Sequence, residues 1–284
     1  MNGSVRLLQS GRYEPQRCAR RFGVVLLVAG LYVLLAYLIA PAIWSHYEHE
    51  PALRELTPRT ATASGIPGDP LNVGIVGTHG ELVTAMLAAA WSPADPLSLK
   101  TSIEITESVL RERADPYAPV SSLFYDGRRQ DLAFEKQVGR SAEQRHHVRF
   151  WRVLEAGKDG RPVWLGAATF DKSVGLSRYT GQITHHINAD VDSERDRLMA
   201  DLSRAGMVSV LFRVSGIGPT LRARNGGGDL FYTDGDILVG VLTVGAAARL
   251  EEPRVEANPN AMDAKNAVWR KGIAWMRSLG WLPD

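Results

Sequence analysis

The stretch RHHVRFW, residues 145–151, predicts a β-strand with two different faces. Side chains of different character alternate along it, which is the period-two pattern of a half-buried strand. One face carries His147 and Arg149 beside a tryptophan, a mixed polar and aromatic set that suits the wall of a ligand cleft. The other face begins at His146 and is otherwise mainly apolar, so we expect it to meet the core.

The segment PVWLGAATFD, residues 162–171, predicts a second strand that returns antiparallel to the first. An Asp-Gly dipeptide at 159–160 favours a tight hairpin turn between the two. With a two-residue turn, position 154 pairs with position 165, and the same register brings the first histidine pair opposite Lys172 and its neighbours. The end of the second strand is therefore expected beside that histidine pair.

Four of the seven histidines lie in two adjacent pairs, and carboxylates lie near both pairs in the sequence. Imidazole and carboxylate groups are the usual protein ligands of zinc, manganese and iron. The candidate ligand cluster consists of His147, Asp171, His185, His186 and Asp190. Neighbouring strand residues point to opposite faces, so only one histidine of each pair can join a given cluster. We expect His147 and one member of the second pair to come within reach of a shared ligand.

A purely structural role for the same residues stays open. The sequence has no H-E-x-x-H and no C-x-x-C motif, and half-buried strand histidines are commonly hydrogen-bonded to backbone or carboxylate groups. Asp190 is also a candidate helix cap. Arg145, Arg149 and Arg224 are candidate anion contacts, because the guanidinium group matches phosphate and carboxylate; solvated strand edges are the alternative. A G-x-S-x-G elbow is absent from the sequence, so no serine nucleophile is indicated.

The run FGVVLLVAGLYVLLAYLI, residues 22–39, contains no charged residue and is long enough to span a bilayer. Five arginines and one glutamate precede it, whereas residues 45–70 hold two arginines and four acidic residues. By the positive-inside rule, this asymmetry predicts a cytoplasmic amino terminus and an extracytoplasmic domain. A cleaved signal peptide is the competing interpretation, although its apolar core typically takes about 7 to 15 residues.

The composition is that of an ordinary globular protein attached to such an anchor. Charged residues make up 23% of the 284 residues and the net charge is +2, which gives no case for binding nucleic acid. The single cysteine, Cys18, cannot form an internal disulfide. The expected organisation is a cytoplasmic basic tail at 1–21, a transmembrane anchor at 22–44, a Pro/Thr/Ala-rich linker at 45–68 and a folded domain at 69–284.

The folded domain is predicted to be α+β, with a mainly antiparallel sheet and flanking helices. Short strands with Asp-Gly turns follow residue 120. Thr78 and Glu81 have the spacing of a capping box that opens a helix. Helices are expected at about 81–91, 102–113, 193–205 and 261–279.

Several unusual strings occur in order and resemble the LssY-like C-terminal domain family. They are LNVGIVGTHGEL, YDGRRQDLAFEKQVG, RHHVRFW, GRPVWLGAATFD, THHINADVDSERD and RARNGGGDLFYTDGDILVGVL. The resemblance covers about residues 69–245. It implies a bacterial membrane-associated protein of a kind sometimes joined to integral membrane segments of the DedA or lipid-phosphatase type. The biochemical function of such domains is not established, and the resemblance assigns no catalytic residue.

Two functions follow as hypotheses, and they do not agree on whether the protein is an enzyme. The first is a binding or accessory module at the cell membrane that takes a lipid headgroup, an envelope polymer or a membrane-protein partner. The alternative is a hydrolase that uses a divalent metal held by the His/Asp cluster. In both, a single-pass anchor places the domain in the periplasm or outside the cell.

Overall fold

The computed structural model describes residues 15–40, 57, 59–94, 122–139, 144–181, 183–215 and 222–282. The helix expected at 102–113 lies outside these residues. Two compact units are present, Met1–Tyr47 and Glu48–Asp284, and each is described by itself.

The amino-terminal unit is helical. Helix α1 (Pro15–Leu34) continues into a π-helical turn, η1 (Leu35–Ile39). Within the described residues, Arg20–Ile39 is the one helix long and apolar enough to cross a membrane, with a mean hydropathy of 2.6 and no part of it buried within the chain. A segment of this composition near an amino terminus fits a membrane anchor or a signal sequence.

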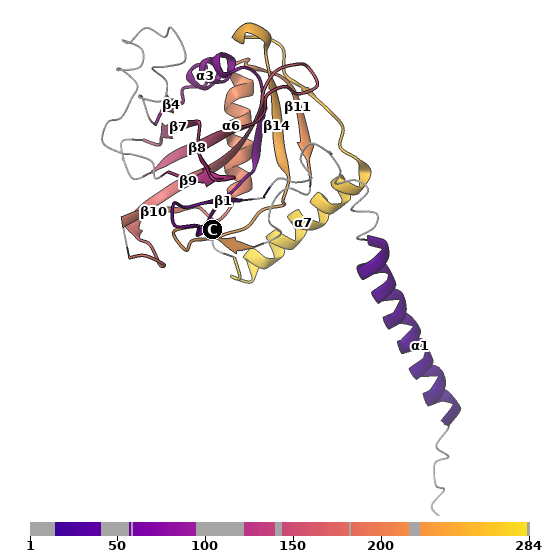
Figure 1. Cartoon of the computed structure of the whole chain (residues 1–284). Helices are drawn as coiled ribbons and strands as arrows, with labels where there is room; N and C mark the ends of the chain where they lie inside the picture. Colours follow the sequence, from indigo (N-terminus) through magenta and orange to yellow (C-terminus); the bar gives the residue numbers. More distant parts are fainter. Residues whose placement is uncertain are drawn as a thin grey trace, which may run out of the picture. The chain divides into compact units, whose positions relative to one another are not determined.

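A mixed sheet forms the centre of the second unit (Figure 1). Nine of the described strands belong to it, and all their pairings are antiparallel except β14 with β3 and β11 with β15. The order is β15 (Arg254–Val255), β11 (Val208–Val214), β14 (Ile237–Leu242), β3 (Val73–Val76), β9 (Val163–Leu176), β8 (Arg145–Leu154), β7 (Leu132–Gln137) and β4 (Ser92–Pro93), with β10 (Ile183–Ile187) on the far half of β9. The predicted α+β class is confirmed.

Helices α3 (His79–Ala88) and α6 (Val191–Arg204) cover one face of this sheet. Their apolar side chains, including Leu82 and Leu198, join strand residues such as Ile75 and Phe150 in the main core. Helix α6 lies against strands β9 and β14 (Figure 1). This is the face to which the alternation in β8 directs His146 and Phe150.

Local capping signals set the ends of both helices. Thr78 and Glu81 form the predicted capping box at the start of α3. Asp190 caps α6 by accepting a hydrogen bond from the Ser193 amide. Helix α6 ends at Arg204, two residues before Gly206, whose φ of 70° is the left-handed conformation that favours glycine.

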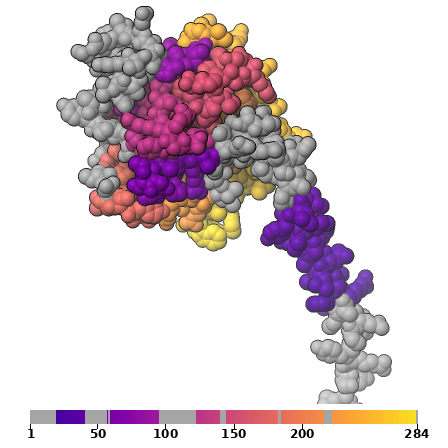
Figure 2. All heavy atoms as spheres, in the orientation of Figure 1, coloured from indigo at the N-terminus to yellow at the C-terminus, as the bar shows by residue number. Residues whose placement is uncertain are grey.

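A small second sheet covers part of the opposite face. It has the order β2 (Pro67–Pro70), β1 (Arg59–Ala61), β5 (Phe124–Tyr125) and β6 (Arg128–Arg129). Its neighbours Leu71, Leu123 and Tyr125 pack on Trp151 and Leu165 of the central sheet. Figure 2 shows the indigo atoms of β1 and β2 lying against the magenta atoms of the β5–β7 segment.

Strands β1 and β2 lie in a stretch where the sequence predicted the end of a linker. The linker was expected over 45–68, but residues 59–61 and 67–70 are paired strands. Ala61 also pairs with Phe124, and the Thr60 hydroxyl donates to the Asp69 carbonyl oxygen. Phe124 is distant in sequence from Ala61, so the Pro/Thr/Ala-rich composition of the stretch did not reveal this partner.

Three short elements and a final helix complete the described part of the domain. They are the pair β12 (Ala223–Arg224) and β13 (Leu230–Phe231), the short 3-10 helix η3 (Val244–Ala246) and the final helix α7 (Asn260–Ser278). Ile273 of α7 packs with Ala189 and Tyr232 in a separate small core.

The β8–β9 hairpin has a different register from the predicted one. Leu154 pairs with Val163, so the prediction that position 154 pairs with 165 was wrong. The connecting loop is longer than two residues, and a bulge near the end of β8 shifts the ladder. As a result, Asp171 rather than Lys172 lies opposite the start of β8, directly across from Arg145.

Candidate functional site

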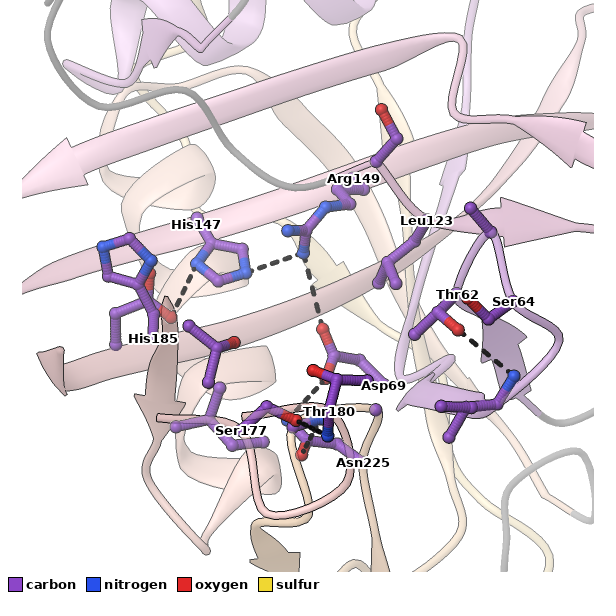
Figure 3. Close-up of a pocket in the computed structure, with 18 of the residues that line it drawn as sticks. Thr62, Ser64, Asp69, Leu123, His147, Arg149, Ser177, Thr180, His185 and Asn225 are labelled. Carbon is purple, nitrogen blue, oxygen red and sulfur yellow. Dashed lines mark hydrogen bonds and ion pairs between the residues drawn. The ribbon is translucent and has the colours of Figure 1, made fainter. Parts of the chain in front are cut away.

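A polar pocket of about 270 Å³ lies on the face of the central sheet opposite the helices α3 and α6. Its walls come from the turn between β1 and β2, from strands β8, β9 and β10, and from the loop between β12 and β13. Figure 3 shows this pocket with His147, Arg149 and His185 on one side and Asn225, Ser177 and Thr180 on another.

Alternation along β8 selects the side chains that form the floor of the pocket. Arg145, His147 and Arg149 all line it, whereas His146 lies on the core side. Thr169 of β9 lies opposite His147. The period-two prediction for this strand therefore describes which face meets the pocket.

Arg145 is the centre of a buried ion-pair network. Its side chain is 2% exposed, and its guanidinium donates to Glu135 at 3.0 Å and to Asp171 at 3.2 Å. It also lies 3.4 Å from Nε2 of His185. Two carboxylates thus offset the cost of burying this charge, which would otherwise be several kcal/mol.

The contacts of His147 fix which of its nitrogens carries the proton. Nε2 lies 2.8 Å from the guanidinium of Arg149 and 2.8 Å from the Thr169 hydroxyl. A guanidinium has no acceptor, so Nε2 must accept the hydrogen bond. The network therefore assigns the neutral tautomer with the proton on Nδ1. Nδ1 points toward Asp171, 3.1 Å from its Oδ1.

Arg149 continues the polar chain across the pocket (Figure 3). Its guanidinium lies 3.4 Å from the carboxylate of Asp69, which in turn accepts from the side-chain amide of Asn225 at 3.2 Å. Burial lowers the pKa of Arg149, and the charge of Arg145 adds to that effect, while Asp69 and Asp171 oppose it. The chain links β8 to β2 and to the β12–β13 loop.

The electrostatics of Asp171 and His185 depend on the same network. Burial alone would raise the pKa of Asp171, but His147, His185 and Arg145 outweigh it and hold the pKa at about 2. Burial lowers the pKa of His185, and Arg145 lowers it further against the opposing effect of Asp171. Asp171 is therefore ionised at neutral pH, and the neutral form of His185 is favoured.

Three members of the predicted ligand cluster come together and two do not. His147, Asp171 and His185 line the pocket. His186 turns away and contacts Asp229 at 2.7 Å. Asp190 caps α6 and accepts from Arg277 on α7, so it serves the helix end.

Of the three arginines predicted as anion contacts, two line the pocket and one does not. Arg145 and Arg149 line the pocket, but each is engaged by carboxylates. Arg224 is exposed and donates to the carbonyl oxygen of Gly228 within its own loop. The two pocket arginines therefore lie among acidic groups of opposite charge.

Among the described residues, no group of three or more His, Cys, Asp or Glu side chains is placed to hold a metal ion. The contacts of the pocket give a physical reason. Nε2 of His147 already accepts from Arg149, and the guanidinium of Arg145 lies beside both Asp171 and His185. A cation at this point would meet two fixed positive charges.

Several residues of the site were not predicted from the sequence. Asp69, Glu135, Thr169 and Asn225 were not singled out, yet each contacts a floor residue or its partner. Asn225 lies in an Asn-Gly turn, where its side chain accepts from two backbone amides of its own loop, and this turn chemistry was a detectable sign of a fixed loop.

The fold and the pocket together describe an α+β domain with a polar pocket of ligand size. The family model described as LssY C-terminus matches residues 51–237, and the chain belongs to this family. The match includes the strands β8, β9 and β10 and the loop that carries Asn225. A search of curated proteins gave no match. A search of solved structures gave no match either.

Proposed function

We propose that the chain is a membrane-anchored binding module and that the pocket on the β8 face is its ligand site. One observation carries this proposal: the floor of the pocket is a set of buried charged and polar side chains held by one another. Arg145, His147, Arg149 and Asp171 are each no more than 5% exposed, and all four line the pocket. Buried charged groups with shifted pKa values in a cleft, as Arg149 and Asp171 are here, are typical of functional sites.

Binding is favoured over hydrolysis because the side chains that could act as a general base or a metal ligand already interact with other residues of the pocket. A general base works best with a pKa near the operating pH, whereas the pKa of Asp171 is held at about 2. Nε2 of His147 is occupied by Arg149 and Thr169, which leaves it no lone pair for a metal or a substrate proton. The site is suited to recognising a ligand in one fixed orientation.

The proposed arrangement in the membrane has the amino terminus in the cytoplasm and the domain outside. The apolar helix Arg20–Ile39 supports the anchor, and the arginine excess before it supports the orientation. A reporter that is active only outside the cytoplasm, fused after the last residue, should be active. Intact mass should show a chain that keeps residues 1–44. Activity of a cytoplasm-only reporter, or cleavage near residue 43, would contradict this arrangement.

Thermal unfolding of the full chain in lipid nanodiscs tests the binding function. A ligand that binds only the folded state raises the unfolding temperature by mass action. The panel contains myo-inositol, inorganic phosphate and ethanolamine, which represent uncharged, anionic and cationic headgroup chemistry. Ser64 is exposed at the pocket, so Ser64→Trp should block the pocket without disturbing its floor.

The matched control is Glu155→Trp, which adds the same ring at a position outside the pocket whose side chain is 80% exposed. At least one probe should stabilise the wild type and the control but not Ser64→Trp. Equal behaviour of all three proteins with every probe would contradict the binding function.

A further inference from the structure

Two polar atoms at the floor of the pocket lack a hydrogen-bond partner among the described residues. They are Nδ1 of His147 and Oδ1 of Asp171. The two side chains are 3% and 1% exposed, and both line the pocket. The atoms lie 3.1 Å apart in an ion-pair contact, and neither makes a hydrogen bond of ordinary geometry. Leaving buried polar atoms unsatisfied costs free energy, so such atoms at a pocket floor indicate a ligand contact.

The two atoms have opposite hydrogen-bonding roles. Nδ1 of His147 carries a proton and donates, because Nε2 accepts from Arg149. Oδ1 of Asp171 only accepts, because the carboxyl is ionised at neutral pH. A hydroxyl oxygen can accept from the first and donate to the second. At the usual 2.7–3.0 Å from each atom, it would complete a triangle with the pair.

We infer that the pocket binds an uncharged, hydroxyl-rich ligand of the polyol or carbohydrate class, one hydroxyl of which bridges Nδ1 of His147 and Oδ1 of Asp171. This inference rests on the proposed binding function and names the ligand class for the same site.

The walls of the pocket fit this ligand class. Hydroxyl side chains line it from three segments of the chain, at Thr62, Ser64, Ser177, Thr180 and Thr184. A volume of about 270 Å³ is just below the ~300–1,000 Å³ typical of ligand pockets, which suits a small polyol or a single sugar unit. A hydroxyl-rich ligand can both donate hydrogen bonds to these hydroxyl side chains and accept hydrogen bonds from them.

The charged groups of the pocket disfavour ligands that would bind through a phosphate group or an ammonium group. A phosphate oxygen without a proton cannot donate to Asp171, and the two pocket arginines are already paired with Glu135, Asp171 and Asp69. An ammonium group can donate to Asp171 but cannot accept from Nδ1 of His147. Only a group that both donates and accepts satisfies both atoms.

Calorimetric titration of the full chain in nanodiscs distinguishes these classes. The probes are glycerol, myo-inositol and methyl α-glucoside, compared with dimethyl phosphate and ethylammonium, which carry a negative and a positive charge and no hydroxyl group. We expect at least one of the uncharged probes to bind and the two charged probes to show no binding. Asp171→Asn should weaken the binding by at least about tenfold, because the bond to a charged acceptor is lost.

The matched control for this substitution is Asp229→Asn. This substitution changes a carboxylate that contacts His186, the histidine next to His185 in the sequence. Asp229 itself does not line the pocket. Binding should remain within about twofold of the wild type. If Asp171→Asn does not fold, ¹⁵N-histidine NMR of the wild type keeps the test open: the bound probe should shift the Nδ1 resonance of His147.

The possible results of this titration test the ligand class and the binding function separately. Binding of dimethyl phosphate or ethylammonium that Ser64→Trp abolishes, with no binding of the uncharged probes, would overturn the ligand class and keep the binding function. Failure of all five probes to bind would overturn both. Binding of an uncharged probe without a change at His147 Nδ1 would overturn the bridging hydroxyl.

Discussion

The guanidinium of Arg149 donates to Nε2 of His147 across 2.8 Å, within a side-chain pair that is almost fully buried. This bond predicts that Nε2 of His147 accepts and that the ring proton is on Nδ1. ¹⁵N NMR of the full chain labelled at histidine should show the corresponding pair of nitrogen shifts. Arg149→Met should remove the constraint on the tautomer. An imidazolium, or a proton on Nε2 in the wild type, would contradict the assignment.

Acid should destabilise the protein through Asp171. Its pKa falls from an ordinary 3.8 to about 2 on folding, so the ionised carboxylate stabilises the folded state above about pH 4. That contribution, on the order of 2 kcal/mol, is lost as the pH falls through about 2. Urea unfolding of the full chain between pH 5 and pH 2 should show this loss. Asp171→Asn should be less stable at pH 5 and should have a flatter pH dependence; equal slopes would contradict the account.

Asn72 should be a strong determinant of stability without being part of the pocket. It is 1% exposed, and its side chain donates to the carbonyl oxygens of Ala168 and Val191 and accepts from the Ala168 amide. Asn72→Ala should lower the free energy of unfolding by ~2–4 kcal/mol, because buried backbone groups lose their partners.

The matched control is Asn258→Ala, which removes one solvent-exposed hydrogen bond to Asp263. Its effect on urea unfolding should stay within ~0.5 kcal/mol. A similar cost for both variants would mean that the Asn72 bonds do not hold β3, β9 and α6 together.

Chelation should leave the folded state unchanged. The positive charges of Arg145 and Arg149 occupy the space beside Asp171, His185 and Nε2 of His147, which a metal would need. Treatment of the full chain with EDTA should not move its unfolding temperature, and elemental analysis should give much less than one metal per chain. Stoichiometric metal, together with a loss of stability on chelation, would restore the metal-dependent hydrolase hypothesis.

Local patterns predicted the floor of the pocket well. Alternation in residues 145–151 separated the pocket side from the core side, because strand geometry imposes a period of two whatever the tertiary context. The capping box at Thr78 and the cap at Asp190 are likewise local, and both are present. The proximity of Asp171 to the first histidine pair was also predicted, although from the wrong register.

The partners that complete the pocket could not be predicted in the same way. Asp69 contacts Arg149 from 80 positions away, and Asn225 contacts Asp69 from 156 positions away. Such contacts depend on how the small sheet packs over the central sheet, and no periodicity in the sequence records that packing. The same limit explains the separation of His186 from the cluster, because its partner Asp229 lies 43 positions further along the chain.

The most direct test of a ligand-binding pocket is native mass spectrometry of the full chain released from its own membranes, without added probes. The wild type should carry a non-covalently bound small molecule, and Ser64→Trp should have lost it, while Glu155→Trp keeps it. Identical masses for the three proteins, after correction for the substitutions, would contradict the claim that this pocket is the binding site.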